Sequence, residues 1–505
     1  AGNYYVRENS SCIDGGAAGA LIGCFGAGCG PVNVGPVWYV DSNGNNANDG
    51  SLEAPFETIS RAVLSAVNGD TIRLNPGVYT EMLDFDSKTV VLESRAFAEN
   101  DPNMILETYF APGQIGGSCL LLDQASNNNA TIRGISFRGG SHPYGGGIAI
   151  INSTPTLEHI IVEENTAEIG GGIYISGSDP VLKNITVRNN GGNLGGGIYV
   201  TEGSPLFEGV VVENNIAYWG GGFYFENAEP TLRHSAVKNN EAFIEGAGLY
   251  QNGGISTIEW TAFEKNNGYD YGGGIVAYQA SIDLDQTTFS GNTSGVGSAM
   301  ALYSSVVTVK NSIIWDNDGP ILYVPESSGI TYLDIGYSDI TGGEDLLADH
   351  PNLIFTTEGG IINQDPEFCF PEDFIYNLQE TSICQTASDS SGVIGAYSSV
   401  CGALAIEQPE VESNSFALLC NYPNPFNPTT NIKYTLTDHG YYTLSIYDVN
   451  GGLVKNLRSG HGSPGEYTVL WDSTNDNGQK VATGLYFYHL STKSNILKNK
   501  MTLVK

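Results

Sequence analysis

The chain has 505 residues, of which 65 are glycine and 28 are tyrosine, and this length is ample for a large core and further domains. Its 55 acidic and 21 basic residues give a net charge of −34, which argues against nucleic acid or anionic lipid as a partner. The sequence contains no long apolar run, so we expect no membrane span.

Two features suggest an exported protein. The chain begins with Ala rather than Met, from which we expect a signal peptide to have been removed. It also holds 8 cysteines, and disulfides persist in oxidising compartments, so we expect disulfides whose pairing the sequence leaves open. The residues considered for them are Cys12, Cys24, Cys29, Cys369, Cys384 and Cys401.

Residues 1–36 form a Gly/Ala-rich extension with too few large side chains to build a core of its own. Its run NYYVRE (3–8) is β-prone, and Tyr4, Tyr5 and Val6 could add as a strand to an exposed sheet edge of another subunit. A contact from the tail of one subunit to the body of the next propagates into a filament. Our hypothesis is that this extension is an assembly segment and that the protein forms a homopolymer.

The segment DSNGNNANDG (41–50) offers Asp41, Asn43 and Asp49 as oxygen ligands, and calcium is the cofactor that this pattern suggests. The alternative is an Asx-rich turn that its own backbone satisfies. After it, residues near 56–68 place apolar side chains at helical spacing and lead into Asn-Gly. This pattern predicts a helix that caps the open end of the first coil.

Residues 37–402 are organised around a repeat. Runs of glycine end at Gly147, Gly172, Gly197, Gly222, Gly248 and Gly274, in steps of 25, 25, 25, 26 and 26 residues. Seven residues ahead of most of these positions lie Gly140, Asn165, Asn190, Asn215, Asn267 and Asn292. An apolar column has the same period, at Leu157, Leu182, Phe207, Leu232, Ile258, Leu284 and Val309. Each unit contains three short β-type runs, so the sequence predicts an all-β fold, a right-handed parallel β-helix of about 25 residues per coil.

Stacked coils explain the composition of the repeat. Equivalent residues lie about 4.8 Å apart, so each column must tolerate its own copy above and below. Glycine permits close backbone approach, and asparagine side chains can pair from coil to coil. Beside the apolar column lies an outward one in which opposite charges mostly alternate: Glu158, Lys183, Glu208, Arg233, Glu259, Asp285 and Lys310. We interpret it as a solvated ladder of weak ion pairs.

The start of this region resembles a known family. Residues 39–79 carry a Tyr-Val-Asp strand, an Asn/Asp/Gly turn, the motif PF-TI and the motif GD-I-L-PG-Y, as in the pectin-lyase-like β-helix proteins. Residues 365–402 resemble the usual end of such secreted helices. The resemblance implies the fold, and it implies activity only weakly, because one fold hosts many functions.

The chemistry of that family is not evident on the regular coils. Its hydrolases use aspartates together with a Gly-His-Gly histidine, and the one such motif here, at 460–462, lies in the last domain. Its lyases need an acidic calcium cluster beside a basic residue that abstracts a proton, and no column brings these together. We therefore predict no catalytic residues.

An acidic linker is expected at 403–415, and residues 416–505 form the last domain. Alternating strands separated by Gly, Asn and Pro turns predict a small immunoglobulin-like β-sandwich. The segments FALLCNYPNPFNPTTNIKYTL (416–436) and GEYTVLWDSTNDNGQKVATGLYFYHL (465–490) resemble a type IX secretion sorting domain. That resemblance implies contact with the type IX secretion machinery and a location outside a Gram-negative bacterium or on its outer surface.

Aromatic side chains also recur at the repeat period. An outward column is predicted at Tyr174, Tyr199, Tyr224 and Tyr250, with a companion column at Tyr144, Ile169, Leu194, Trp219 and Tyr271. One interpretation is β-propensity with self-stacking. The other is an exposed stripe that binds sugar rings or a neighbouring subunit.

Two classes of function follow from these patterns. The first is a non-catalytic extracellular structural or adhesive protein, with self-association or a surface polysaccharide as its partner. The second is a glycan-binding protein or a carbohydrate-active enzyme, a lyase or a hydrolase, whose site lies on the irregular coils around residues 80–118 or 320–365. An aromatic stripe without a convergent acid/base group favours the first class.

Overall fold

The computed structural model describes residues 35–503 with gaps, in two compact units that span residues 1–403 and 404–505. The gaps are 82, 87, 100–106, 113–116, 124–128, 347–349, 371–374, 390–391, 398–416, 419–427, 437–439, 448–451, 463–464, 477 and 493–495. None of the helices in the described part has the length and apolar character that crossing a membrane requires.

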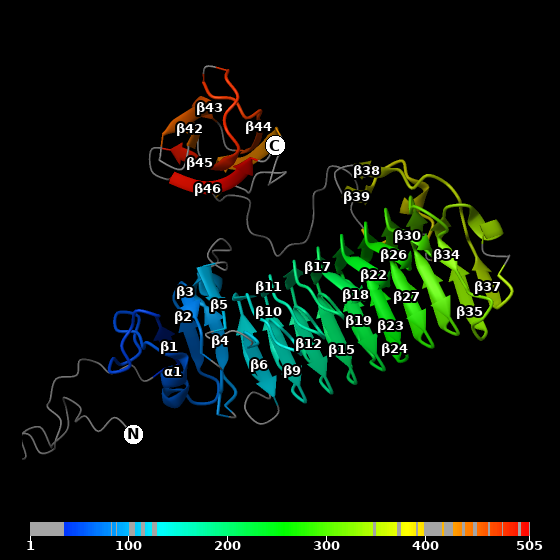
Figure 1. Cartoon of the computed structure of the whole chain (residues 1–505), viewed down its shortest axis with the longest axis horizontal. Coiled ribbons are helices and arrows are strands. Elements are labelled where there is room, and N and C mark those ends of the chain that lie inside the picture. Colours follow the sequence, from blue (N-terminus) through cyan, green and yellow to red (C-terminus); the bar gives the residue numbers. More distant parts are fainter. Residues whose placement is uncertain are drawn as a thin grey trace, which may run out of the picture. The chain divides into compact units, whose positions relative to one another are not determined.

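The first unit is a solenoid of parallel strands in long sheets (Figure 1). Sheet A has 13 strands: β1 (Val37–Val40), β2 (Thr71–Leu74), β4 (Val91–Ser94), β7 (Thr131–Arg133), β10 (Thr156–Glu158), β13 (Val181–Lys183), β16 (Leu206–Glu208), β20 (Thr231–Arg233), β24 (Ile255–Glu259), β28 (Ser281–Asp285), β32 (Val306–Lys310), β35 (Thr331–Gly336) and β37 (Leu353–Gly359). Sheet B has 11: β3 (Gly77–Tyr79), β5 (Thr108–Phe110), β8 (Ser136–Arg138), β11 (Ile161–Glu163), β14 (Thr186–Arg188), β17 (Val211–Glu213), β21 (Ala236–Lys238), β25 (Ala262–Glu264), β29 (Thr288–Ser290), β33 (Ile313–Trp315) and β36 (Asp339–Ile340).

Two further sheets complete the coils. Sheet C has nine strands: β6 (Leu120–Asp123), β9 (Ile148–Ile151), β12 (Ile173–Ser176), β15 (Ile198–Thr201), β19 (Phe223–Glu226), β23 (Leu249–Asn252), β27 (Ile275–Tyr278), β31 (Met300–Tyr303) and β34 (Leu322–Tyr323). Sheet D is a short fourth sheet of β18 (Ile216–Trp219), β22 (Glu241–Glu245), β26 (Asn267–Tyr271) and β30 (Thr293–Val296). The three long sheets were predicted from the repeat, whereas sheet D was not.

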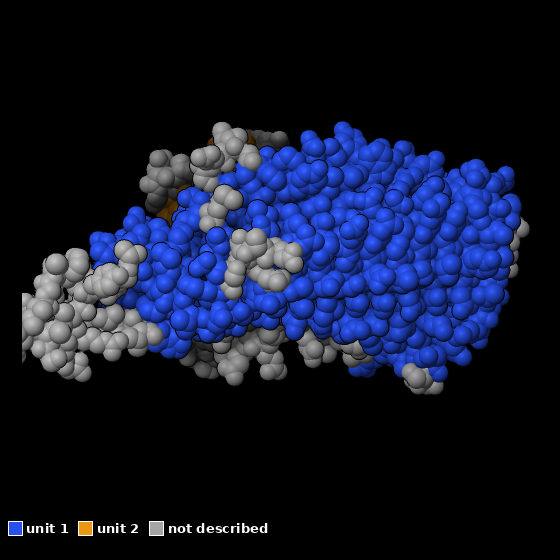
Figure 2. Space-filling view, turned by 90° about the horizontal axis from the view of Figure 1, so that it is seen from below, with its two compact units in different colours: residues 1–403 blue, residues 404–505 orange. Residues whose placement is uncertain are grey.

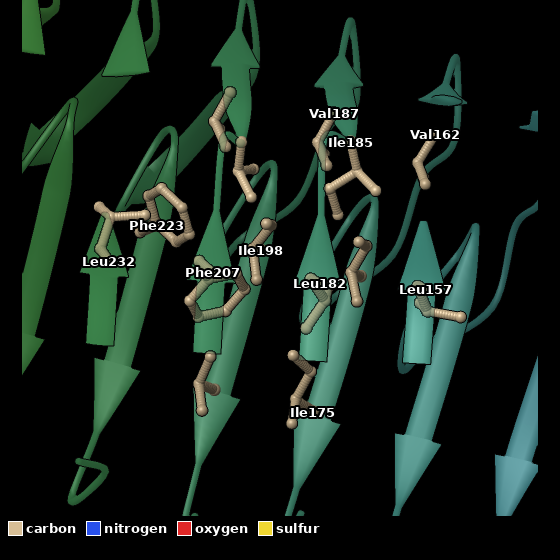
Figure 3. Close-up of a cluster of buried hydrophobic side chains, with 14 of the residues drawn as sticks. Leu157, Val162, Ile175, Leu182, Ile185, Val187, Ile198, Phe207, Phe223 and Leu232 are labelled. Carbon is tan, nitrogen blue, oxygen red and sulfur yellow. The ribbon is translucent and has the colours of Figure 1, made fainter. Parts of the chain in front are cut away.

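The predicted apolar column forms the interior of the solenoid. Leu157, Leu182, Phe207 and Leu232 are neighbours in register on sheet A, each at most 1% exposed, and the next three members continue the stack. Figure 3 shows this row with apolar side chains of the other sheets packed against it. The charged column beside it points outward as predicted, and the β-helix fold is therefore confirmed.

An asparagine ladder runs along one corner inside the coils. The side-chain amide of Asn190 donates to Asn215 Oδ1 at 3.0 Å, and that of Asn215 donates to Asn240 Oδ1 at 3.0 Å. The same oxygen of Asn215 also accepts the backbone N–H of Asn190, at 3.0 Å, and its amide donates to the carbonyl of Val187. Every polar atom of a buried amide is thus paired, which is the condition for burying it without loss of stability.

The position of this ladder corrects part of the sequence analysis. Asn240 and Asn266 continue it between Asn215 and Asn292, whereas Asn267 is the first residue of β26. The 26-residue coils carry their extra residue between the ladder and the glycines, where the pairing of β18 with β22 shifts register. Counting back from the glycines therefore gave an asparagine that is one residue too late.

The glycine runs lie where neighbouring coils approach closely, as predicted. Gly220 has a φ of +67°, a conformation that costs other residues energy. A Cβ on Gly222 would lie 2.6 Å from the carbonyl oxygen of Gly248 in the next coil. Side chains are therefore excluded from this corner by the backbone of the neighbouring coil.

Helix α1 (Ile59–Ser65) covers the N-terminal end of the solenoid and is shorter than the predicted 56–68. Thr58 caps it by accepting from the backbone N–H of Arg61, and the Glu81 carboxylate accepts from the backbone N–H of Ile59 at 2.8 Å. The helix stops because Ala66 is extended, and Val67 after it is 64% exposed. A second short helix, α2 (Arg95–Ala98), follows β4.

The C-terminal end of the solenoid is arranged differently. Strand β37 is the last of sheet A and pairs on one side with β35, and its inward side chains Leu353 and Phe355 are only partly buried. The chain then passes through β38 (Phe368–Phe370) and β39 (Ile375–Leu378). The described residues of 383–397 pack on the outer side of sheet B, around Ile313 and Cys384. Two 3-10 helices, η3 (Gly343–Leu346) and η5 (Ile383–Gln385), lie in this region.

The second unit is the predicted sandwich of two antiparallel sheets. One contains β40 (Ala417–Leu418), β41 (Thr430–Leu436) and β44 (Gly465–Trp471), and the other contains β42 (Gly440–Tyr447), β43 (Leu453–Gly462), β45 (Gly484–Thr492) and β46 (Ile496–Leu503). Trp471 and Tyr488 are fully buried in its core. The Gly-His-Gly motif lies on β43, where His461 pairs with Tyr441 of β42, so this histidine belongs to a sandwich strand.

The asparagine ladder gives the first prediction. Replacing Asn215 with Ala leaves the buried N–H groups of Asn190 without acceptors, so the free energy of unfolding should fall by about 2–4 kcal/mol. The exposed Asn193 is the matched control, and its replacement should change stability by at most about 0.5 kcal/mol. Urea unfolding followed by circular dichroism measures both, and equal midpoints for the two variants would contradict the role of the ladder.

Candidate functional site

The predicted tyrosine column exists and is continuous. Tyr174, Tyr199, Tyr224 and Tyr250 are direct neighbours in sheet C. Successive ring centroids lie 5.6, 5.1 and 4.9 Å apart, and Tyr144 extends the row at 5.3 Å from Tyr174. Self-stacking along the coils is therefore an observed property of this column.

The side chains of that column differ in their exposure. Tyr199 is only 4% exposed and Tyr224 only 8% exposed, while Tyr174 and Tyr250 are half-buried. Burial raises the pKa of Tyr224 to about 12 and also raises the pKa of Tyr199, whose hydroxyl donates to Glu226. The rings of Tyr199 and Tyr224 are therefore packed among their neighbours, and use of the column as a binding or assembly surface stays a prediction.

The companion column is also in register, with one member that the sequence analysis missed. Tyr144, Ile169, Leu194 and Trp219 pair in order, and Trp219 then pairs with Glu245 before Tyr271. Tyr144 is 48% exposed and the others are half-buried. The pKa of Glu245 is raised by burial and by Asp270, against a hydrogen bond from Tyr303 that lowers it.

The exposed aromatic surface lies on sheet D instead. Tyr218, Phe243 and Tyr269 are 47%, 45% and 52% exposed. Ring centroids lie 5.6 Å apart for Tyr218 and Phe243, and 5.7 Å apart for Phe243 and Tyr269. We call these residues the aromatic ladder. Large exposed apolar patches on a folded protein mark contact sites.

The sequence carried a signal for this ladder that was overlooked. Its members are spaced by 25 and 26 residues, which is the period of the repeat. However, Tyr218 lies two residues before Gly220, whereas Phe243 and Tyr269 lie three residues before Gly246 and Gly272. The extra residue of the longer coils therefore hid the column from an alignment on glycine.

A row that is mostly polar lines one side of the aromatic ladder. Two residues earlier on each strand lie the apolar Ile216 and then the polar Glu241, Asn267 and Thr293, which pair in register across sheet D. Thr293 Oγ1 donates to Asn267 Oδ1 at 2.9 Å. Within the described part of the chain, the Glu241 carboxylate and the Asn267 amide N–H groups have no side-chain partner, so they are available to a ligand.

The charged side chains on the strands of sheet D are all acidic. The strands of sheet D contain Glu241, Glu245 and Asp270, and their sequences include no Lys, Arg or His. The nearest cation in sequence, Lys265, lies at the preceding corner and acts on Glu264. Sheet D therefore presents exposed aromatic rings, hydrogen-bonding groups and carboxylates.

Several carboxylates elsewhere on the coils are paired with cations. The buried Glu93 bonds both Arg73, at 2.5 Å, and Arg133, at 2.7 Å, which extends the predicted charged column toward the N-terminus. Within that predicted column, among the described residues, Arg233 and Glu259 form an ion pair, at 2.8 Å. Sheet B adds pairs that the sequence analysis missed, including Arg188 with Glu163 at 2.7 Å. Such pairs serve the fold and are not arranged as an acid and a base.

The segment considered for calcium adopts the alternative conformation. Oδ1 of Asp41 accepts from the backbone N–H of Asn43 at 2.8 Å, and Oδ1 of Asp49 accepts from that of Ser51 at 3.0 Å. The other carboxylate oxygen of Asp41 accepts from the Asn75 amide. These are Asx turns, and the described residues contain no group of three His, Cys, Asp or Glu placed for a metal. Calcium binding there stays a prediction.

The six cysteines considered for disulfides divide into three groups. Cys369 is disulfide-bonded. Cys384 is a free, buried thiol 3.2 Å from the Asp339 carboxylate, which corrects its expected place in a disulfide. Cys12, Cys24, Cys29 and Cys401 lie outside the described residues, as do Tyr4, Tyr5 and Val6 of the assembly segment.

Comparison with known families supports the architecture. Residues 115–218 and 195–334 match a family model described as a right handed beta helix region. Residues 428–495 match the FlgD Ig-like domain. The chain is a right-handed β-helix followed by a FlgD Ig-like domain. Residues 42–93 match a model described as a protein of unknown function, DUF1565.

The chain also aligns with solved structures at low sequence identity and low TM-scores. Pectate lyase Pel9A is 14% identical, over 73% of this chain and 97% of that one, with a TM-score of 0.38. XylC in complex with xylose is 9% identical, over 92% of this chain and 100% of that one, with a TM-score of 0.40. A rhamnogalacturonan lyase is 12% identical, over 66% of this chain and 91% of that one, with a TM-score of 0.28. No curated protein sequence matches significantly.

A buried carboxyl next to the segment 383–397 gives the second prediction. Glu264 on β25 is 2% exposed and accepts from the Tyr397 hydroxyl at 2.5 Å. Burial raises its pKa from 4.5 to about 7, although the Tyr397 hydrogen bond and the charges of Lys238 and Lys265 lower it. The folded state therefore binds the proton more tightly than the unfolded state, so stability should fall as the pH rises from about 4.5 to about 7, by up to about 3 kcal/mol.

The variant Glu264→Gln isolates this contribution. The unfolding midpoint of the wild type should drop between pH 5 and pH 8 relative to that of Glu264→Gln. The exposed Glu229, replaced by Gln, is the control and should follow the wild type. Parallel pH profiles for the wild type and Glu264→Gln would show that the Glu264 carboxyl does not titrate in this window.

Proposed function

We propose that this protein is a non-catalytic extracellular adhesive protein, in which a rigid β-helix presents sheet D for contact. The observation that carries the proposal is the aromatic ladder, whose residues Tyr218, Phe243 and Tyr269 are about half exposed and in ring contact from coil to coil. A folded protein that exposes stacked aromatic side chains on a regular face uses them to bind a partner. The surrounding coils supply rigidity through the asparagine ladder and the tyrosine column.

The arrangement of charged groups supports a role without catalysis. Catalytic carboxylates require pKa values and partners suited to proton transfer. Here Glu93, Glu163 and Glu259 are held by arginines. The solenoid face in Figure 2 is closely packed, without a deep hollow in the part that described residues form.

A polysaccharide lyase is the second candidate, favoured by one outward group on sheet A. Asp283 lies two residues before Asp285 on β28 and near Lys310, and burial together with Asp285 raises its pKa. An acidic group beside a lysine is what a lyase requires. However, Lys310 Nζ bonds Glu358 at 3.0 Å, so the lysine is engaged as an ion pair.

For the FlgD Ig-like domain we propose the role of a type IX sorting domain. The sequence resemblance over residues 416–436 and 465–490 supports it. Export by that machinery would place the protein outside a Gram-negative bacterium or on its outer surface, where an adhesive β-helix could act. Deletion of residues 416–505 should then leave the protein inside the cell, and export of the truncated chain would contradict this role.

Self-association into a filament is a further part of the proposal. Strand β37 ends sheet A with an edge that no described strand pairs, and such edges accept a strand from another chain. Residues 3–8 of a second copy are the proposed strand. Removing residues 1–30 should abolish fibres in electron micrographs of the secreted protein, and unchanged fibres would contradict the assembly role.

The third prediction tests the absence of catalysis. The full chain, incubated with polygalacturonate with and without calcium, should release neither unsaturated products nor new reducing ends, while it should co-sediment with an insoluble surface polysaccharide. Turnover that is lost in Lys310→Ala or Asp283→Asn would establish the lyase instead. Lys183→Ala, in the same outward column as Lys310, is the matched control.

A further inference from the structure

The chemistry of the ligand can be read from sheet D. The aromatic ladder repeats every coil, with ring centroids 5.6 and 5.7 Å apart. Sugar rings have apolar C–H faces that pack on aromatic side chains, and an extended β-linked glycan repeats on nearly the same spacing. The Phe243 and Tyr269 rings stack on each other with 23° between their planes, so each offers its exposed part to a ligand. A row of exposed rings with this period fits a linear saccharide that runs along the solenoid axis.

The polar row beside the ladder suits the same ligand. Glu241, Asn267 and Thr293 lie next to the rings on consecutive strands. They offer a carboxylate, an amide and a hydroxyl, which together can accept from and donate to sugar hydroxyl groups. A partner that was only apolar would leave these groups without water and without hydrogen bonds, at a cost in binding free energy.

Charge decides between classes of saccharide. Glu241 and Glu245 lie on β22 and Asp270 lies on β26, the four strands of sheet D contain no cation, and the whole chain has a net charge of −34. A polymer of uronic acids or sulfated sugars would meet like charges at close range, which opposes binding. A neutral saccharide meets no such repulsion.

We propose that the aromatic ladder binds a neutral, extended polysaccharide, with sugar rings packed on Tyr218, Phe243 and Tyr269. The inference rests on the proposed adhesive function and names its ligand class. The ladder ends where Asn193 and Gly295 replace an aromatic side chain in the adjoining coils. Its length is two coil spacings, about 10 Å, so each protein holds a short run of sugar units.

The experiment uses the full chain and two soluble probes of equal length and opposite class, cellohexaose as the neutral probe and hexagalacturonate as the anionic one. Isothermal titration should show binding of cellohexaose that is insensitive to salt, and no binding of hexagalacturonate. The triple variant Tyr218→Ala, Phe243→Ala, Tyr269→Ala should bind cellohexaose at least tenfold more weakly. Tyr332→Ala removes a tyrosine that is 48% exposed on sheet A and should bind as the wild type does.

The outcomes separate the inference from the proposed function. Circular dichroism and the unfolding midpoint should match those of the wild type for the triple variant, because its substitutions lie on the surface. Unchanged affinity in that variant, preference for hexagalacturonate, or no binding of cellohexaose by the wild type would each overturn the neutral-glycan inference while leaving an adhesive role. Release of cleaved sugars would instead overturn the proposed non-catalytic function.

Discussion

The stacking of each coil on an identical neighbour, one strand spacing away, is the constraint on which the rest of the molecule depends. Inside, it requires that a buried polar side chain pair with its own copy, and Asn215 meets this requirement through Asn190 and Asn240. At the corners it excludes side chains, as the approach of Gly222 to the carbonyl of Gly248 shows. A solenoid of this kind is quasi-one-dimensional, and its surface consists of columns.

The outward columns differ in how far their side chains pair with or cover one another, and these differences bear on function. Some outward charges pair between coils, as Arg188 does with Glu163, and Tyr199 and Tyr224 of the tyrosine column are almost fully buried. Sheet D differs because the extra residues of the longer coils lie within its strands, beside Phe243 and Tyr269. These residues remain exposed, and they give the solenoid an aromatic face that its own neighbours do not cover.

Much of the fold could be predicted from the sequence because the repeat period is visible in the spacing of its residues. Leu182 and Phe207 repeat in register, and alternation along a strand decides that Lys183 and Glu208 point outward. The candidate site was harder, because exposure depends on what neighbouring columns cover. Tyr199 and Tyr218 are both outward tyrosines, yet they are 4% and 47% exposed. Free Cys384 was missed for a similar reason, since pairing depends on distances that spacing does not give.

The most direct measurement of the central claim is a crystal structure of the full chain grown with cellohexaose. The account predicts sugar rings over Tyr218, Phe243 and Tyr269, hydroxyl groups within hydrogen-bonding distance of Glu241 and Asn267, and an intact chain of six sugars. Density for the saccharide on sheet A beside Asp283 and Lys310, or density for a cleaved product, would contradict it.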